Sequence, residues 1–394
     1  MTPIQRVAEL GQSIWLDNLR RSMFGSGELA RMIGDGLRGM TSNPTIFDKA
    51  IAGGDDYDDA IRALVAREPG LDDVALFERL AVADIQAACD AFRPVYEQSG
   101  HGDGFVSLEV SPRVASDTQA TIAEARRLHA AVARPNVMIK VPGTAAGMPA
   151  IRCLIADGIK VNTTLLFGLD AYLAAADAYL TGLEERVARG DDVRELAGVA
   201  SFFLSRIDTA VDKQLDALAA SATGERRALL AGLRGKTAIA NAKAAYVKYQ
   251  ELIGSPRWQA LAAAGARPQR LLWASTSTKD PAYPPLMYVE ALIGRDTVDT
   301  VPSDTYRALL DHGAERLRES LPDDLDGAGR TLARLAEVGV SLDAVTDQLV
   351  VDGVALFAAS FDGVVRAVAS KRARLGRPSP GRAAPVGAPP GVPR

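Results

Sequence analysis

The chain is poor in the residue types that build disulfide frameworks and metal centres. Its 394 residues include 2 cysteines and 3 histidines, and the histidines (His101, His129 and His312) show no metal-ligand spacing. A disulfide scaffold and a thiolate metal site are therefore excluded, and the low cysteine content fits a reducing compartment.

The sequence also lacks a strong excess of one charge and any targeting pattern. Its net charge is −4, which argues against a dedicated nucleic-acid binder. The first residues do not show the basic-then-apolar pattern of a signal peptide, and no uninterrupted apolar run stands out as long enough to cross a bilayer. We expect a cytoplasmic protein that binds neither nucleic acid nor membrane.

The C-terminal end differs in composition from the rest of the chain. Residues 371–394 carry six basic residues and no acidic one, and the segment is rich in proline and glycine. Such a segment cannot bury enough apolar surface to offset the entropy lost on ordering. We therefore predict one catalytic domain over 1–370, followed by a basic, disordered tail over 371–394.

Short β-rich runs alternate with longer helical patterns along the domain. Helices are expected at 170–189, 207–220, 236–252 and 342–370. The expected strands are Ser13–Asp17, Gly39–Phe47, Gly104–Val110, Asn136–Val141, Lys160–Leu166, Gly198–Leu204, Arg270–Ser277 and Thr297–Val301. About eight such repeats predict a (β/α)8 TIM barrel with additional helices. A doubly wound open sheet is the alternative, disfavoured because no glycine-rich phosphate loop follows a strand.

Polar residues close the inward rows of nearly all of these strands. Alternate residues of a barrel strand face inward, and chemistry gathers at the C-terminal strand ends. Because a barrel interior prefers branched apolar side chains, this pattern indicates a functional site. The rows, taken by alternation, end in Asp17, in Thr41 and Asn43, in Glu109, in Lys140, in Asn162 and Thr164, in Ser201, and in Trp273, Ser275 and Ser277.

Lys140 is the most informative of these residues, because its neighbours in the run Val137–Val141 are apolar. Loss of hydration disfavours an ammonium group, and a neutral amine in a pocket attacks carbonyl groups to form a Schiff base. The protons of that chemistry need carriers, and Glu109 and Asp17 are candidates, with Thr164 holding a water. The alternative is that Lys140 forms an inert ion pair with one of these carboxylates.

Two cationic residues follow the sixth and seventh strands, where many barrels bind phosphate. Arg206 suits a bidentate grip on phosphate and Lys279 a point charge, although their positions alone slightly favour surface ion pairs. Lys160 has the inward parity of Asn162 but lies at the opposite end of its strand, so we expect it to be structural or solvated.

Several ordered motifs resemble those of the transaldolase family, in the longer form found in actinobacteria and relatives. The resemblance spans about residues 10 to 370 and is carried by SIWLDNLRR, GMTSNPTIFDKAI, GFVSLEVSPR, NVMIKVPGT, IKVNTTLLF, ASFFLSRID, LLWASTSTKDPAY and DTVDTVP. It implies a (β/α)8 barrel that works through a Schiff base, with no metal and no organic cofactor. The implied reaction moves a dihydroxyacetone unit from sedoheptulose 7-phosphate to glyceraldehyde 3-phosphate, giving erythrose 4-phosphate and fructose 6-phosphate, in the non-oxidative pentose phosphate pathway.

The resemblance also implies roles for individual residues. Lys140 is the Schiff-base lysine, Glu109 and Thr164 position a catalytic water, and Asp17 is the acid/base at carbon–carbon cleavage. The resemblance assigns the binding of substrate hydroxyls and phosphate to Asn43, Asn162, Ser201, Arg206 and Ser275. One motif departs from the family, because Ser277 stands where many members have a phosphate-binding arginine, and the charge would come from Lys279 instead.

Two alternatives stay open. A fructose 6-phosphate aldolase would use the same Schiff base without an acceptor sugar, and turnover of fructose 6-phosphate alone would reveal it. A non-catalytic sugar-phosphate-binding barrel would hold Lys140 in an inert ion pair and form no covalent adduct. The expected partners are sugar phosphates only, and the expected assembly is a monomer or a homodimer.

Overall fold

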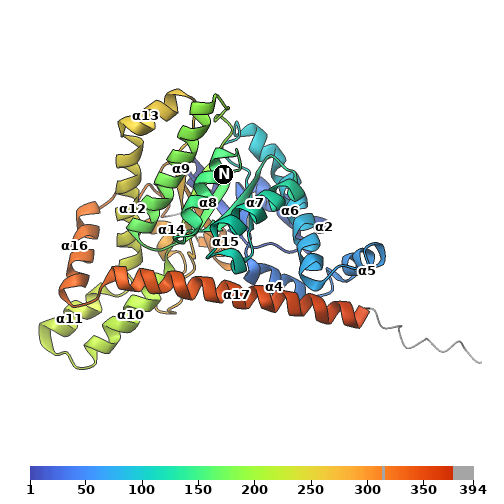
Figure 1. Cartoon of the computed structure of the whole chain (residues 1–394). Helices are drawn as coiled ribbons and strands as arrows, with labels where there is room; N and C mark the ends of the chain where they lie inside the picture. The colour runs from blue at the N-terminus through green and yellow to red at the C-terminus, as the bar shows by residue number, and fades with distance from the viewer. Residues whose placement is uncertain (313–315, 376–394) are drawn as a thin grey trace, which may run out of the picture.

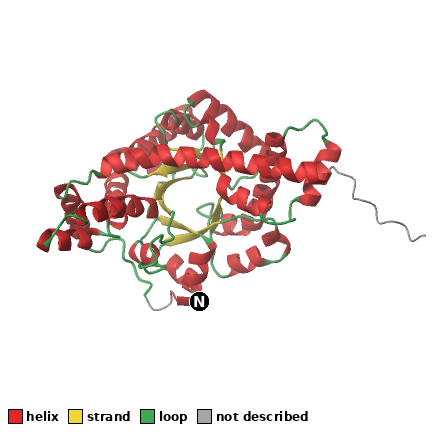
Figure 2. Cartoon of the chain, turned by 90° about the horizontal axis from the view of Figure 1, so that it is seen from below, coloured by secondary structure: helices red, strands yellow, loops and turns green. Residues whose placement is uncertain are grey.

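The chain folds around a closed parallel β-barrel, which confirms the predicted (β/α)8 architecture. The structure is a computed structural model that describes residues 1–312 and 316–375. Eight strands follow one another around the barrel in chain order, and β8 closes it against β1. Figure 2 shows strands at the centre of the molecule with helices around them. The strands are β1 (Gln12–Asp17), β2 (Gly39–Thr41), β3 (Val106–Glu109), β4 (Val137–Pro142), β5 (Val161–Leu166), β6 (Gly198–Phe203), β7 (Gln269–Ala274) and β8 (Thr297–Val301).

Helices surround the barrel, and the four expected ones are found as α9, α10, α12 and α17, with ends that differ by a few residues. The helices are α1 (Pro3–Glu9), α2 (Ser22–Gly25), α3 (Glu28–Gly34), α4 (Pro44–Ala52), α5 (Asp58–Arg67), α6 (Asp73–Gln98), the short 3-10 helix η1 (Pro112–Val114), α7 (Thr118–Val132), α8 (Gly147–Ala156), α9 (Leu169–Arg189), α10 (Ser205–Ala219), α11 (Gly224–Leu233), α12 (Thr237–Ile253), α13 (Pro256–Ala263), α14 (Met287–Ala291), α15 (Ser303–His312), α16 (Leu325–Glu337) and α17 (Leu342–Leu375).

Two strands end at least three residues earlier than predicted, each for a local reason. β2 stops at Thr41 because Asn43 begins α4: its Oδ1 accepts the backbone N–H of Ile46 at 3.0 Å, and Pro44 occupies the first turn. β7 stops at Ala274 because Ser275 has a φ of 57°, which turns the chain out of the sheet. The predicted strands 39–47 and 270–277 are therefore too long at their C-terminal ends.

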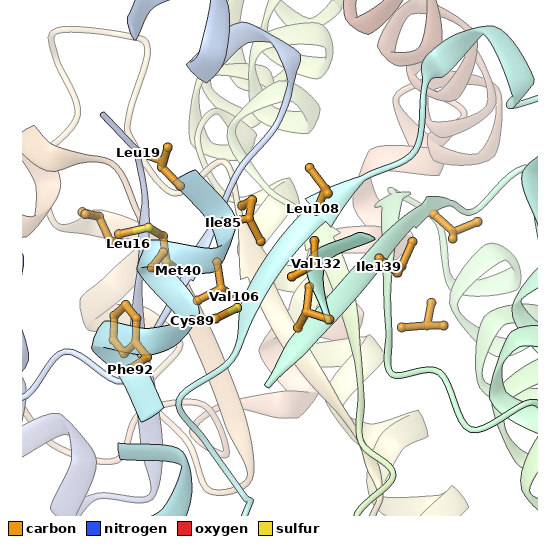
Figure 3. Close-up of a cluster of buried hydrophobic side chains, with 14 of the residues drawn as sticks. Leu16, Leu19, Met40, Ile85, Cys89, Phe92, Val106, Leu108, Val132 and Ile139 are labelled. Atoms are coloured by element: carbon orange, nitrogen blue, oxygen red, sulfur yellow. The ribbon is translucent and has the colours of Figure 1, made fainter. Parts of the chain in front are cut away.

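The main hydrophobic core lies between the outer face of the barrel and the helices around it. In Figure 3 the strand residues Leu16, Met40, Val106, Leu108 and Ile139 gather with side chains of α6 and α7. The α6 residues are Ile85, Cys89 and Phe92, all with 0% exposure. Cys89 thus packs as a small hydrophobic side chain, as expected from its sequence context, and burial raises the pKa of its thiol.

The C-terminal helix α17 crosses one end of the barrel (Figures 1 and 2). By length and hydropathy alone it could span a membrane, which the sequence analysis did not expect. Here it packs against α4, and Lys371 pairs with Asp58 at 2.8 Å, both side chains being nearly buried. The helix continues to Leu375, so the predicted start of the tail at 371 falls inside it; residues 376–394 lie outside the described part of the chain.

Candidate active site

The register of the barrel brings the predicted site residues to one end. Residues opposite each other in neighbouring strands point to the same side of a sheet. Asp17 lies opposite Thr41, Glu109 opposite Lys140, and Lys140 opposite Asn162. A pocket of about 280 Å³ opens there, lined by the predicted residues Asp17, Asn43, Lys140, Ser201, Arg206, Ser275, Ser277 and Lys279, together with residues from α4, β8 and α17.

Lys140 lines this pocket with only 4% of its surface exposed. Its Nζ is 3.4 Å from Oε2 of Glu109 and donates a hydrogen bond of 3.4 Å to the carbonyl of Ser42. The ring centre of Phe357, on α17, lies 5.8 Å from the same nitrogen. The amine is thus held beside one carboxylate in an almost fully buried setting.

Glu109 and Thr164 each have a buried side-chain oxygen that can accept a further hydrogen bond. Within residues 1–312 and 316–375, Oε2 of Glu109 is buried with no polar neighbour other than the 3.4 Å contact with Lys140, and Oγ1 of Thr164 is buried without a hydrogen-bond partner. Burial raises the pKa of Glu109 to about 7, against the opposing effect of the Lys140 charge. A carboxyl group with that pKa can both accept and release a proton near neutral pH.

Asp17 and Asn162 are held by networks that begin inside the barrel. Oδ1 of Asp17 accepts a hydrogen bond of 2.8 Å from the hydroxyl of Thr41. Asn162 donates to Ser107 at 3.0 Å and accepts from the hydroxyl of Ser201 at 2.6 Å. These bonds fix the orientation of the carboxylate and the amide before any ligand arrives.

The opposite wall of the pocket is cationic. Burial lowers the pKa of Arg206, while the charges of Asp17 and Glu109 oppose the shift. Burial also lowers the pKa of Lys279, and the charges of Arg206 and Lys49 lower it further. Lys279 reaches the hydroxyl of Ser277 at 2.6 Å. Three cations therefore face the same small space, which suits a phosphate group.

Lys49 was missed by the sequence analysis. It lies on α4, one turn beyond Thr45, and both side chains line the pocket. A lysine in a helix normally indicates a solvated face. Only the position of Asn43, which starts α4 at the end of β2 and so aims the helix across the barrel mouth, could have suggested its direction.

The inward row predicted for the seventh strand is wrong. Ser201, which lines the pocket, lies opposite Leu272, whereas Trp273 lies opposite Phe202 and Asp299. Leu272 and Ala274 therefore face inward and Trp273 faces the helices, where its indole nitrogen donates to the carbonyl of Leu292 at 3.1 Å.

Ser275 and Ser277 line the pocket even though they do not continue the row of Trp273. The turn at Ser275, with its positive φ, redirects the chain, and the Ser275 hydroxyl shares a hydrogen bond of 2.8 Å with Ser205 at the start of α10. Lys160 lies at the opposite end of the barrel, as predicted, with its Nζ 5.8 Å from the ring of Tyr96.

These features define a class of protein. A parallel eight-stranded barrel with a buried lysine beside a carboxylate at the C-terminal strand ends, and cations lining the same pocket, is a lysine-centred aldolase-type enzyme. The chain belongs to the transaldolase/fructose-6-phosphate aldolase family, whose model matches residues 14–368.

Curated relatives cover nearly the whole chain. A protein named Transaldolase from Trichodesmium erythraeum is 46% identical over 371 residues, which are 94% of this chain and 97% of the relative. Transaldolase 2 from Nostoc punctiforme is 47% identical over 376 residues, with 93% and 96% covered. The Transaldolase of Neisseria gonorrhoeae is 46% identical over 362 residues, with 92% and 98% covered.

Proposed function

We propose that this enzyme transfers a dihydroxyacetone unit from sedoheptulose 7-phosphate to glyceraldehyde 3-phosphate, giving erythrose 4-phosphate and fructose 6-phosphate in the non-oxidative pentose phosphate pathway. The observation that carries the proposal is the buried Lys140 amine, 3.4 Å from a Glu109 carboxyl whose pKa is raised to about 7 by burial. The family membership and the relatives support it further.

In the proposed reaction the Lys140 amine adds to the C2 ketone of the donor, and loss of water gives an iminium. Asp17 then accepts the proton of the C4 hydroxyl while the C3–C4 bond breaks, and the electron pair moves into the iminium to give an enamine. The aldehyde leaves, the acceptor aldehyde enters, and the steps run in reverse. Glu109 and Thr164 position the water that is lost and later added.

Binding is assigned to the remaining polar residues of the mouth. The Oδ1 of Asn43 caps α4 by accepting the backbone N–H of Ile46, and its amide N–H groups are left to donate to substrate hydroxyls. Asn162 and Ser201 would hold the hydroxyls near the iminium. The phosphate would be held by Arg206, Lys279, Ser275 and Lys49. The two lysines then supply the positive charge that an arginine at the position of Ser277 would supply.

The test is transfer itself, measured as release of erythrose 4-phosphate from the two substrates. We expect the unmodified enzyme to be active and Lys140→Ala to lose at least about a thousandfold in rate while keeping its fold. Normal turnover by Lys140→Ala would contradict the mechanism. Fast cleavage of fructose 6-phosphate without an acceptor would instead favour the aldolase alternative, and binding without turnover the binding-barrel alternative.

We also propose that the enzyme works in the cytoplasm, as a monomer or a homodimer, with sugar phosphates as its partners and without a metal or organic cofactor. The low cysteine content and the slightly acidic net charge support this setting. Cell fractionation and sedimentation velocity test the first two points, and activity after dialysis against EDTA tests the third.

A further inference from the structure

Phe357 joins the two halves of the pocket although it comes from the last helix of the chain. Its side chain is 4% exposed and lines the pocket from α17. The ring centre lies 5.8 Å from Nζ of Lys140 and 5.8 Å from the guanidinium carbon of Arg206. One aromatic ring is thus within cation–π distance of both the proposed nucleophile and the proposed phosphate ligand.

Arg206 has a second aromatic contact, because its guanidinium carbon lies 5.4 Å from the ring centre of Phe203. Within the described residues no carboxylate lies within ion-pair distance of this guanidinium. Two rings therefore flank the guanidinium, and within residues 1–312 and 316–375 its N–H groups donate no hydrogen bond to the protein, which leaves them for a phosphate.

The backbone of α17 is held close to the site at both ends of this contact. A Cβ at Gly353, one turn before Phe357, would approach Leu165 of β5 to 2.9 Å and Nη1 of Arg206 to 3.6 Å. Further along the helix, Lys371 is anchored by Asp58 and by the carbonyl of Gly54. Phe357 is therefore delivered by a fixed helix that approaches the strand ends closely.

We infer that Phe357 is a positioning residue with two separable effects: its bulk keeps water away from the Lys140 adduct, and its π face orients Arg206 toward the substrate phosphate. The inference rests on the proposed function, because the adduct it protects is the dihydroxyacetone enamine. A transferase needs such protection for as long as the first aldehyde has left and the second has not arrived.

The cost of failed protection follows from the chemistry. If water reaches the enamine, its C3 carbon takes a proton from water and becomes an iminium again. Hydroxide or water then adds to the iminium carbon, the C–N bond breaks, and dihydroxyacetone leaves with the Lys140 amine regenerated. The net change is cleavage of fructose 6-phosphate into dihydroxyacetone and glyceraldehyde 3-phosphate, a side reaction that can be measured directly.

The experiment compares Phe357→Ala with Phe357→Leu. We expect Phe357→Ala to raise acceptor-free release of dihydroxyacetone, relative to transfer, by about tenfold, and to raise KM for fructose 6-phosphate by about threefold to tenfold. Phe357→Leu restores the bulk but not the π face, so it should return the release ratio to within about twofold of the unmodified enzyme while KM stays raised.

Val368→Ala is the matched control. Val368 lies further along α17 and is 0% exposed, but it lines neither this pocket nor the adjoining cavity that Glu109 and Asn43 share. This control should keep the release ratio and KM of the unmodified enzyme. Equal changes in Phe357→Ala and Val368→Ala, or no change in the Phe357 variants, would overturn the inference. Absence of transfer by the unmodified enzyme would instead overturn the proposed function.

Discussion

The two ends of the barrel use similar polar side chains in opposite ways. At the N-terminal end, the carboxylate of Asp103 accepts hydrogen bonds from the Ser13 hydroxyl and, at 2.8 Å, from the Trp15 indole, and it faces Arg270 at 3.4 Å. At the C-terminal end, Glu109 forms one ion pair in the described part of the chain, with Lys140 at 3.4 Å, and the oxygen in that pair has no other polar partner there. The carboxylate of Asp103 therefore has several hydrogen-bond partners, whereas that of Glu109 has few.

Because of this difference, neighbouring inward residues of one strand serve either the stability of the barrel or its function. Ser13, Trp15 and Asp17 follow one another on the inner face of β1, yet the first two serve the closed network and the third lines the pocket. A buried polar atom without a partner costs free energy. The fold tolerates that cost at the mouth, where a substrate or water supplies the missing partner.

Within this comparison, the largest effect is expected from a change at the C-terminal end of the barrel. Glu109→Gln removes the group that moves protons beside Lys140, so transfer should slow by about a hundredfold to a thousandfold. Because burial raises the pKa of Glu109 to about 7, its base form appears as pH rises through 7, and activity of the unmodified enzyme should rise over that range. Rates from pH 5.5 to 8.5 test this: the Gln variant should lose the rise, and an unchanged profile would contradict the role of Glu109.

The corresponding change at the closed end should act on stability alone. Asp103→Ala leaves the Arg270 charge and the Trp15 N–H without their partner, so we expect a loss of about 3 kcal/mol in the free energy of unfolding. Urea titration measures that loss. The rate per folded molecule should stay within about twofold of the unmodified enzyme, and a large fall in that rate would show that the two ends are coupled.

A smaller effect is expected on the cationic wall. Lys279→Ala should raise KM for fructose 6-phosphate by about tenfold with little change in kcat, because the phosphate is bound in the ground state and the transition state alike. Lys49→Ala should raise KM by about threefold, since its side chain lines the same pocket from α4. If either variant lowers kcat and leaves KM unchanged, the phosphate assignment is wrong.

The smallest effect concerns a buried carboxyl on the outer face of the barrel. Burial raises the pKa of Asp299 to about 8 from its ordinary value near 3.8, and the hydrogen bond with Thr276 opposes the shift. The unfolded chain releases this proton at lower pH, so the folded chain loses stability as pH rises, until about 8. Between pH 7 and 8 the loss should be about 1 kcal/mol.

Asp299→Asn is the check on that slope. The free energy of unfolding of the variant, from melting curves, should decline little between pH 7 and 8. Glu109, with its pKa of about 7, makes most of its own contribution to the pH dependence of stability below that range. A variant that keeps the full decline would show that another group carries it.

Much of the barrel and the center of the site could be predicted from the sequence. Alternation within short apolar runs predicts Asp17, Glu109, Lys140 and Asn162 on the inner face, because each of these strands is regular as far as that residue. β5 becomes irregular only beyond Asn162, where its register shifts between Thr163 and Leu166. The seventh strand failed because Ser275 adopts a positive φ, which a serine does not signal as a glycine would.

Residues delivered by helices could not be placed in the same way. Lys49 and Phe357 reach the pocket because of how α4 and α17 cross the mouth, and that depends on packing between segments far apart in the sequence. The periodicity of a helix identifies its apolar face but not the neighbour that this face meets. The structure was needed to show that α17 closes the site.

The most direct test of the central claim is borohydride reduction in the presence of fructose 6-phosphate, followed by mass mapping of the peptides. The account predicts a reduced three-carbon adduct on Lys140, formed equally with and without EDTA, and absent from Lys140→Ala. An adduct on another lysine, or no adduct while the sugar phosphate still binds, would contradict it.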